Sequence, residues 1–173
     1  MKKLMWSALL ALVGCGSSNS PTSEVAPAYA TLLKTMYKGT VPLVTGEELV
    51  ALQHVQPKVV LLDARSPAEY NVSHLPGARF VDYDSFRPET LADVPREQPV
   101  VVYCSVGVRS ERVGEQLKAQ GYTNVRNLYG GIFQWVNEAR PVVNTQGQIT
   151  ERVHPYSALW GAWLTRGEKT YQP

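Results

Sequence analysis

The sequence predicts an α/β fold in which helices flank a central parallel sheet. Short runs of β-branched and apolar residues, such as 58–63 and 100–103, alternate with segments that carry a helical pattern, and this alternation is typical of βαβ units. The run 100–103 is apolar on both faces, as expected for a parallel strand that is covered on both sides. Cys104 stands where that strand stops, at the edge of the sheet where open α/β folds bind ligands.

The first 14 residues predict a signal peptide. Two lysines precede an apolar run, residues 4–13, that is too short to span a bilayer. The run closes on LVGC, which resembles the lipobox of bacterial lipoproteins, whose cysteine becomes the lipid-modified first residue. An ordinary secretory signal with a chance cysteine is the alternative. We therefore expect an exported protein that is lipid-anchored through Cys15 in the bacterial cell envelope, at the outer membrane where the source has one.

Charge and cysteine content narrow the classes of function. The formal net charge is +2 at pH 7, and removal of residues 1–14 takes away two lysines and no acid. The mature chain is then neutral, which argues against a nucleic-acid partner. Once Cys15 carries lipid, Cys104 is the one remaining cysteine of two. It cannot form an internal disulfide, so it is either inert and buried or kept for chemistry.

Residues 15–42 divide into a tether and a helical segment. The small, polar, proline-broken segment 15–27 predicts a flexible tether, and 28–42 is the segment of the N-terminal helix. Apolar residues at i, i+3, i+4, i+7 and i+8 predict a helix over 27–38 that Gly39 stops. This helix either packs on the body or offers a face to a partner.

Segment 43–139 carries the predicted sheet. Thr45 and Glu48 form a capping box for a helix that runs to about His54. The further predicted elements are the strand 58–63, a Ser-Pro helix start, a turn at Pro76-Gly77, a strand over 78–83, one turn of helix near 88–93, the strand 100–103, a helix capped by Ser110 and ended by Gly121, a strand over 124–128 and a helix over 132–138.

The stretch VVVYCSVGVRS, residues 100–110, predicts a reactive cysteine. Backbone N–H groups of the loop after Cys104, together with the positive end of the following helix, face whatever the sulfur carries. Arg109 adds a cation that can hold an oxyanion, and this environment favours an exposed thiolate. The alternative is a buried core cysteine at a strand end, because free cysteine is among the most buried residue types.

The sequence contains three collinear motifs that resemble the rhodanese superfamily of sulfurtransferases: LLDARSPAEYNVSHLPGA, VVYCSVGVRS and GYTNVRNLYGGIFQW. The resemblance covers 43–139 and implies a central parallel sheet of five strands. It implies that Cys104 carries a sulfane sulfur as a persulfide. It also implies a substrate-binding loop and a DxR...E...H segment. The loop residues are Ser105, Val106, Gly107, Val108, Arg109 and Ser110, and the second segment supplies Asp63, Arg65, Glu69 and His74.

The resemblance implies a reaction that needs no metal and no cofactor. The Cys104 thiolate takes sulfur from a small sulfur-containing anion or from a polysulfide or persulfide, and a thiol or cyanide accepts it. Thiosulfate-using members often have a basic residue after the cysteine, where this chain has Ser105. Arg109 is therefore the one cation of the loop, which counts against thiosulfate itself.

The sequence leaves more than one role open for the residues of the DxR...E...H segment. We interpret Asp63, Glu69 and His74 as structural support, although His74 is also a candidate general base. Arg65 and Glu69 are four residues apart and can pair across one helical turn. A direct contact of Arg65 with substrate is the alternative.

Two other classes of function remain. A cysteine phosphatase uses a Cys-x5-Arg loop, whereas four residues separate Cys104 from Arg109 here, and Tyr103 rather than histidine precedes the cysteine. A non-catalytic binding module keeps the fold and presents its cleft or its outer helices to a partner. Retention of the cysteine together with Gly107 and Arg109 counts against the binding module.

The C-terminal extension, residues 140–173, predicts a hairpin around Gln146-Gly147 and a second extra helix after the domain. The apolar positions at helical spacing are Tyr156, Leu159, Trp160, Trp163 and Leu164. They either pack against the body or touch a membrane interface through the two tryptophans.

Overall fold

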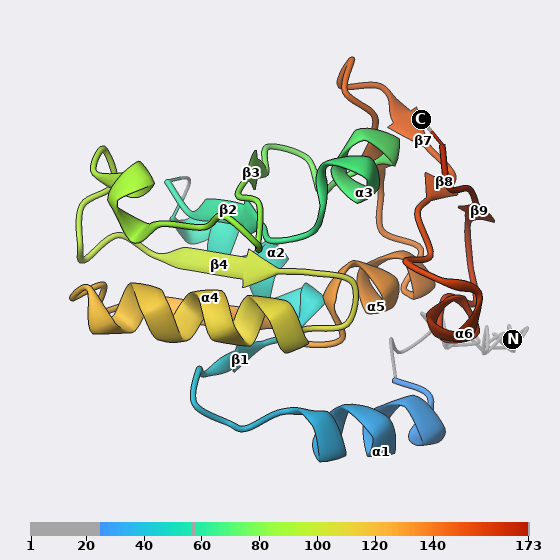
Figure 1. Cartoon of the computed structure of the whole chain (residues 1–173), viewed down its shortest axis with the longest axis horizontal. Coiled ribbons are helices and arrows are strands. Elements are labelled where there is room, and N and C mark those ends of the chain that lie inside the picture. The colour runs from blue at the N-terminus through green and yellow to red at the C-terminus, as the bar shows by residue number, and fades with distance from the viewer. Residues whose placement is uncertain (1–24, 57, 173) are drawn as a thin grey trace, which may run out of the picture.

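The computed structural model describes residues 25–56 and 58–172 and has a central sheet of five parallel strands (Figure 1). The strand order is β1-β5-β4-β2-β3, and each neighbouring pair is parallel. The predicted α/β class and parallel sheet are therefore confirmed. The strands are β1 (Leu43–Val44), β2 (Val60–Asp63), β3 (Arg79–Phe80), β4 (Val100–Tyr103) and β5 (Val125–Leu128).

The sheet is covered on both faces, and β4 shows how. Its four residues are buried, and alternate side chains enter two separate hydrophobic cores. Val101 and Tyr103 join the core that includes residues of α1, α2 and α5, whereas Val100 and Val102 join the core that includes residues of α4. These helices are α1 (Pro27–Met36), α2 (Gly46–Val55), α4 (Val108–Ala119) and α5 (Gly131–Asn137).

The local start signals of two helices are confirmed in atomic detail. Thr45 and Glu48 form the predicted capping box of α2. Ser66 and Glu69 form a second capping box, which begins α3 (Pro67–Val72). One turn of 3-10 helix, η1 (Pro88–Leu91), stands where a helical turn was expected.

The predicted start of α4 is wrong by three residues. The helix begins at Val108, and its N-cap is Gly107 with φ of 104°, not Ser110. A positive φ is accessible to glycine at little cost, so the chain turns sharply there and enters the helix early. Ser110 lies in the first turn, and its hydroxyl donates to Asn127 Oδ1 at 2.7 Å.

The C-terminal extension forms the expected hairpin but only a single helical turn. Strands β6 (Val142–Val143) and β7 (Ile149–Thr150) pair antiparallel, and β8 (Arg152–Val153) and β9 (Glu168–Lys169) pair parallel. Helix α6 is Ala158–Gly161.

The predicted apolar stripe of this segment is wrong at two positions. Tyr156 adopts a φ of 64° before the helix, and both Tyr156 and Leu159 are exposed. The helix also ends early, and Asn137 of α5 then holds the chain that follows it. Its side-chain amide donates to Trp163 O, and its Oδ1 accepts from Thr165 N.

The N-terminal helix packs on the body, where it meets the extension. Tyr29 and Leu33 of α1 are buried, and the Tyr29 ring stacks on Trp163 with centroids 5.4 Å apart. Both segments lie near the carboxyl end of β4 (Figure 1). The predicted signal peptide, the lipobox cysteine Cys15 and most of the tether lie outside the described residues. No helix in 25–56 or 58–172 has the length and hydropathy to cross a membrane.

Candidate active site

Cys104 lies at the bottom of a pocket rather than on the surface. The residue follows β4 directly and is only 1% exposed, so the expectation of an exposed thiol is wrong. It nevertheless lines a cavity of about 190 Å³. A ligand in this cavity would therefore meet the sulfur from one side only.

The loop after Cys104 turns its carbonyl oxygens away from the cavity. Four consecutive carbonyls accept hydrogen bonds from groups outside the loop. The pairs are Ile132 N to Cys104 O at 2.9 Å, Phe133 N to Ser105 O at 3.1 Å, Tyr37 Oη to Val106 O at 2.6 Å and Asn127 Nδ2 to Gly107 O at 2.8 Å. Successive peptide groups that point their oxygens outward point their N–H groups inward, which makes an anion-binding concavity.

One of the inward amides contacts the sulfur. The Gly107 N–H donates to Cys104 Sγ at 3.1 Å. The amides of Ser105 and Val106, and those of the first three residues of α4, have no protein acceptor in the described part of the chain. The start of a helix leaves such N–H groups free and adds its positive dipole end. The loop therefore offers several donors to a negative group on the sulfur.

Gly131 keeps the loop close to α5. A side chain at this position would collide with the backbone of Cys104 and Ser105, and its φ of 57° is also unfavourable for other residues. The glycine therefore lets the α5 amides reach the loop carbonyls.

Arg109 does not stand free in the loop. Its guanidinium donates two hydrogen bonds to Glu69, at 2.9 and 2.7 Å, and one to Ser105 Oγ at 2.9 Å. Burial alone would raise the pKa of Glu69, but the hydrogen bonds and charge of Arg109 lower it to about 2. Ser105 also donates to Glu69 Oε1 at 2.6 Å. The cation of the loop is thus compensated by a carboxylate.

Arg65 forms a different pair from the one expected. It binds Asp63, with the shortest contact at 2.6 Å, and not Glu69. The guanidinium also donates to Ser73 O at 2.6 Å, and Tyr103 Oη donates to Asp63 at 2.7 Å. Since Arg65 is fully buried and does not line the pocket, the predicted contact of Arg65 with substrate is not supported by this geometry.

His74 lies in a structural setting. Its ring stacks on Tyr70 with centroids 3.9 Å apart, and its backbone exchanges two hydrogen bonds with Val143 of β6. Burial lowers the pKa of this histidine. His74 does not line the Cys104 pocket, so it is placed to hold the extension against the domain rather than to act on a ligand there.

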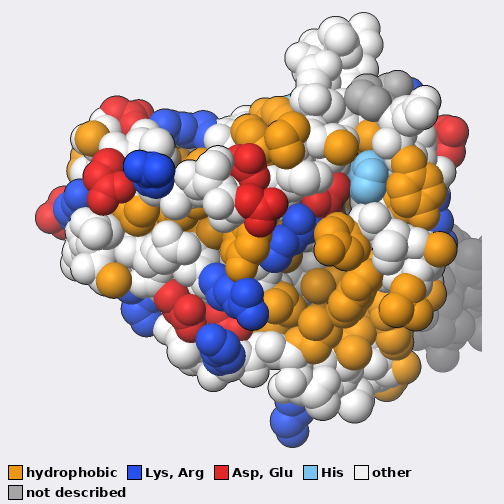
Figure 2. Space-filling model, in the orientation of Figure 1, with side chains coloured by type: hydrophobic (Ala, Val, Ile, Leu, Met, Phe, Trp, Pro, Cys, Tyr) orange, Lys and Arg blue, Asp and Glu red, His pale blue; other side chains and the backbone are white. Residues whose placement is uncertain are grey.

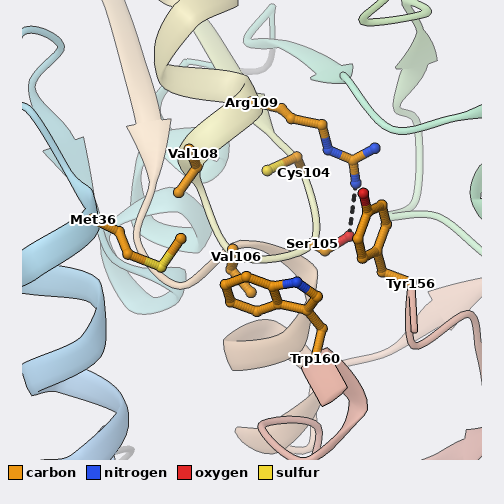
Figure 3. A pocket seen from close by; sticks show the side chains of 8 residues that line it. All are labelled: Met36, Cys104, Ser105, Val106, Val108, Arg109, Tyr156 and Trp160. Atoms are coloured by element: carbon orange, nitrogen blue, oxygen red, sulfur yellow. Dashed lines mark hydrogen bonds between the residues drawn. The ribbon is translucent and has the colours of Figure 1, made fainter. Parts of the chain in front are cut away.

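Three of the residues that line the pocket come from segments that flank the predicted domain. Met36 comes from α1, and Tyr156 and Trp160 come from the extension (Figure 3). The Tyr156 ring lies 5.0 Å from the Arg109 guanidinium. Figure 2 shows hydrophobic side chains gathered around a hollow on this face. Sequence reasoning missed these lining residues, because helical spacing marks apolar residues without saying what they face.

The remaining lining residues belong to the loop and the start of α4. Val106 and Val108 add apolar surface beside Cys104, and Ser105 and Arg109 complete the wall. In the described ranges, no three histidine, cysteine, aspartate or glutamate side chains lie close enough together to hold a metal ion. The pocket therefore combines a sulfur nucleophile, backbone donors and an apolar surface.

Comparison with known proteins shows which family the chain matches. Residues 45–138 match the family model described as Rhodanese-like domain. A sulfurtransferase of Allochromatium vinosum is 36% identical over 89 residues, which cover 51% of this chain and 82% of that protein. A rhodanese-related protein of Thermoplasma volcanium has a similar structure, with a TM-score of 0.52 and 25% identity over 59% of this chain and 97% of that one.

A longer relative shares only this part. The probable adenylyltransferase/sulfurtransferase MoeZ of Mycobacterium tuberculosis is 33% identical over 85 residues, which cover 49% of this chain. The match spans 22% of the mycobacterial protein. The similarity therefore concerns one domain of that protein.

Proposed function

We propose, from the premise that this chain belongs to the rhodanese-like domain family, that it transfers sulfane sulfur through a persulfide on Cys104. The donor is a small sulfur-containing anion, a polysulfide or a persulfide, and the acceptor is a thiol or cyanide. The observation that carries the proposal is the orientation of the loop. Its four carbonyls are bound from outside, the Gly107 N–H donates to the cysteine sulfur, and the neighbouring amides have no protein acceptor in the described part of the chain.

The first step forms one S–S bond and breaks another. The Cys104 thiolate attacks the sulfane sulfur of the donor, and the group that carried this sulfur leaves with the electron pair of the broken bond. The product is Cys104–S–S⁻, whose terminal sulfur bears the charge. The amides of the loop and the start of α4 are placed to stabilise that charge as it develops.

The second step returns the enzyme to its starting state. An acceptor thiolate or cyanide attacks the terminal sulfur, and Cys104 leaves as a thiolate. The two half-reactions share one pocket, so the kinetics are of the ping-pong type. The loop needs no large movement between the steps, because its carbonyls remain held by α5, Tyr37 and Asn127.

The geometry gives less support to phosphate chemistry. A cysteine phosphatase holds its substrate with the arginine of the loop, whereas both terminal nitrogens of Arg109 are already bound to Glu69. The cavity beside Cys104 is also lined mainly by apolar side chains. These contacts favour a terminal sulfur over a tetrahedral phosphate.

The location of the protein is part of the same proposal. The charged and apolar start of the sequence and its LVGC motif support export and lipid attachment at Cys15. Metabolic labelling with a fatty-acid analogue would mark the protein and not a Cys15→Ser variant. Labelling of both, or of neither, would contradict the anchor without affecting the chemistry at Cys104.

Mass spectrometry of the intact protein tests the sulfur transfer. Incubation with thiosulfate, a polysulfide or an organic persulfide should add about 32 Da at Cys104, the mass of one sulfur atom. Cyanide should then remove this mass. A Cys104→Ser variant, shown to be folded by circular dichroism, should gain nothing. If none of these donors marks Cys104, the binding-module alternative replaces this proposal.

A further inference from the structure

The pocket above Cys104 is completed by residues that lie outside the matched domain. Met36 of α1 and Trp160 of α6 stand on different sides of the cavity, and Tyr156 closes it near Arg109 (Figure 3). Residues 45–138 therefore supply the nucleophile, the amides and the valines beside the sulfur, and the flanking segments supply a wall of Met36, Tyr156 and Trp160.

The charge balance of the site does not favour an inorganic dianion. Arg109 is the one cationic side chain among the residues that line the cavity, and Glu69 compensates it. The buried pair of Arg65 and Asp63 is likewise neutral as a unit. Once Cys104 is a thiolate, the set carries a net negative charge, so a doubly charged donor meets repulsion that only backbone amides oppose.

The size and lining of the cavity favour a compact apolar group. A cavity of about 150 Å³ lined by apolar side chains binds benzene, and the volume here is about 190 Å³. The side chains of Met36, Val108 and Trp160 offer it a thioether, a branched alkyl group and an indole ring. Thiosulfate and cyanide have no group that could cover this surface.

We propose that the flanking segments make this protein selective for organic sulfane donors, in which an apolar group of about the size of a phenyl ring carries the transferable sulfur. The inference rests on the proposed function of Cys104. The apolar group lies against Met36 and Trp160, and the sulfane sulfur lies at Cys104 beneath the loop amides. The flanking segments therefore decide which donor is used, and the matched domain performs the transfer.

The chemistry is balanced for an organic hydropersulfide. The Cys104 thiolate and R–S–SH give Cys104–S–SH and R–S⁻, so one S–S bond breaks, one forms, and no oxidant or reductant is consumed. A thiosulfonate donor, R–SO₂–S⁻, gives Cys104–S–S⁻ and the sulfinate R–SO₂⁻ in the same way. In both cases R remains in the apolar part of the pocket during the transfer.

Three donors separate the effect of the apolar group from the effect of charge. Benzenethiosulfonate and methanethiosulfonate carry the same single charge and differ in R, whereas thiosulfate is a dianion without a carbon group. The readout is the rate of sulfur addition to Cys104 in the full chain, divided by the rate of the same donor with N-acetylcysteine. We expect this corrected rate to be roughly tenfold or more higher for benzenethiosulfonate than for methanethiosulfonate. It should also be higher for methanethiosulfonate than for thiosulfate.

Variants of the wall test whether the flanking segments cause this preference. Trp160→Ala and Met36→Ala, on different segments, should each lower the phenyl-to-methyl ratio several-fold, and Trp160→Phe should restore part of it. Leu159→Ala is the matched control on α6, because Leu159 is 79% exposed and does not line the pocket. This control should keep the ratio of the parent protein.

The outcomes distinguish this inference from the function on which it rests. Equal corrected rates for all three donors would leave sulfur transfer intact and overturn the selectivity. A ratio that survives in both Trp160→Ala and Met36→Ala would also overturn it. If no donor adds sulfur to Cys104, the proposed function fails, and the selectivity fails with it.

Discussion

The loop after β4 and the wall that faces it are built in different ways. The carbonyls of the loop accept two hydrogen bonds from backbone amides of α5 and two from the side chains of Asn127 and Tyr37, and the loop turns at Gly107, which has a positive φ. The wall is held by side-chain contacts between two chain ends, such as the stack of Tyr29 on Trp163. Backbone amides can be kept while side chains vary, so we assign the proposed chemistry to the loop and the proposed selectivity to the wall.

This contrast predicts a large stability effect beneath the loop. Asp63→Asn removes the charge that compensates fully buried Arg65. Loss of one partner of a buried ion pair costs about 3–5 kcal/mol, and the free energy of unfolding in urea should fall by that amount. Asp93→Asn breaks the exposed pair with Arg79 and serves as the control, with no measurable loss expected. Equal losses in the two variants would contradict the assigned role of the buried network.

The second largest expected effect on the free energy of unfolding is that of Glu69, and its pH dependence follows from the shift in the pKa. The pKa of Glu69 is lowered from 4.5 to about 2, as Arg109 outweighs the opposing effect of burial. A carboxyl whose folded pKa lies below its unfolded pKa stabilises the fold above pH 4.5, and this contribution is lost as pH falls towards 2. Glu69→Gln should therefore cost roughly 3 kcal/mol at pH 7. The difference from the parent protein should shrink between pH 4.5 and 2.

The capping box provides the control for that experiment. Glu69 also accepts from Ser66 N and Oγ at the start of α3, so part of the loss is the loss of a cap. Glu48→Gln removes the corresponding carboxylate from the exposed capping box of α2 and should cost about 0.5 kcal/mol, because glutamine also serves at this capping position and only the charge near the helix start is lost. A loss of the same size in both variants would assign the whole effect to capping.

The wall should respond to a change that leaves the loop in place. Trp163→Ala removes the ring that stacks on Tyr29 and is partly buried in the core. We expect a loss of about 2 kcal/mol in the free energy of unfolding, and a lower phenyl-to-methyl ratio because α6 is no longer fixed. The corrected rate of sulfur addition from methanethiosulfonate is the reference in this ratio. A ratio equal to that of the parent protein would show that the wall does not depend on this stack.

Local signals in the sequence predicted the fold well, because they act over a few residues. The capping box at Thr45, the Ser-Pro helix start at Ser66 and the buried strand before Cys104 each follow from neighbouring side chains. The sequence also predicted that Cys104 lies at the carboxyl end of a parallel strand. What it could not predict is how distant segments meet that strand end.

The pairing of Arg65 shows why one such prediction failed. The spacing of Arg65 and Glu69 suits an ion pair only when both residues lie in one helix. Helix α3 begins at Pro67 with Ser66 as its N-cap, so Arg65 precedes the helix and turns to Asp63 instead. Glu69 is then free to bind Arg109, which is 40 residues away in the sequence. No local pattern marks this contact.

The smallest predicted effect concerns His154, which lies beneath the wall. Its Nδ1 accepts a hydrogen bond from Tyr156 N at 3.0 Å, and its ring contacts Tyr171 edge-on. Burial lowers the pKa of His154, and Glu69, Arg65 and Arg109 are the charged groups that act on it. A histidine whose folded pKa is lowered destabilises the fold as pH falls below the unfolded value of 6.5, because the unfolded state binds more protons.

Two variants separate the effect of His154 on the pH dependence of stability from that of His74, whose pKa is also lowered by burial. The melting temperature of the parent protein should fall between pH 7.5 and 5.5, and His154→Gln should reduce that fall by a few degrees. Glutamine carries no titrating group, so this variant removes the protonation at position 154 while keeping a polar side chain there. If His154→Gln leaves the pH dependence unchanged and His74→Gln removes it, the sensitive contact lies at Val143 and not beside the pocket.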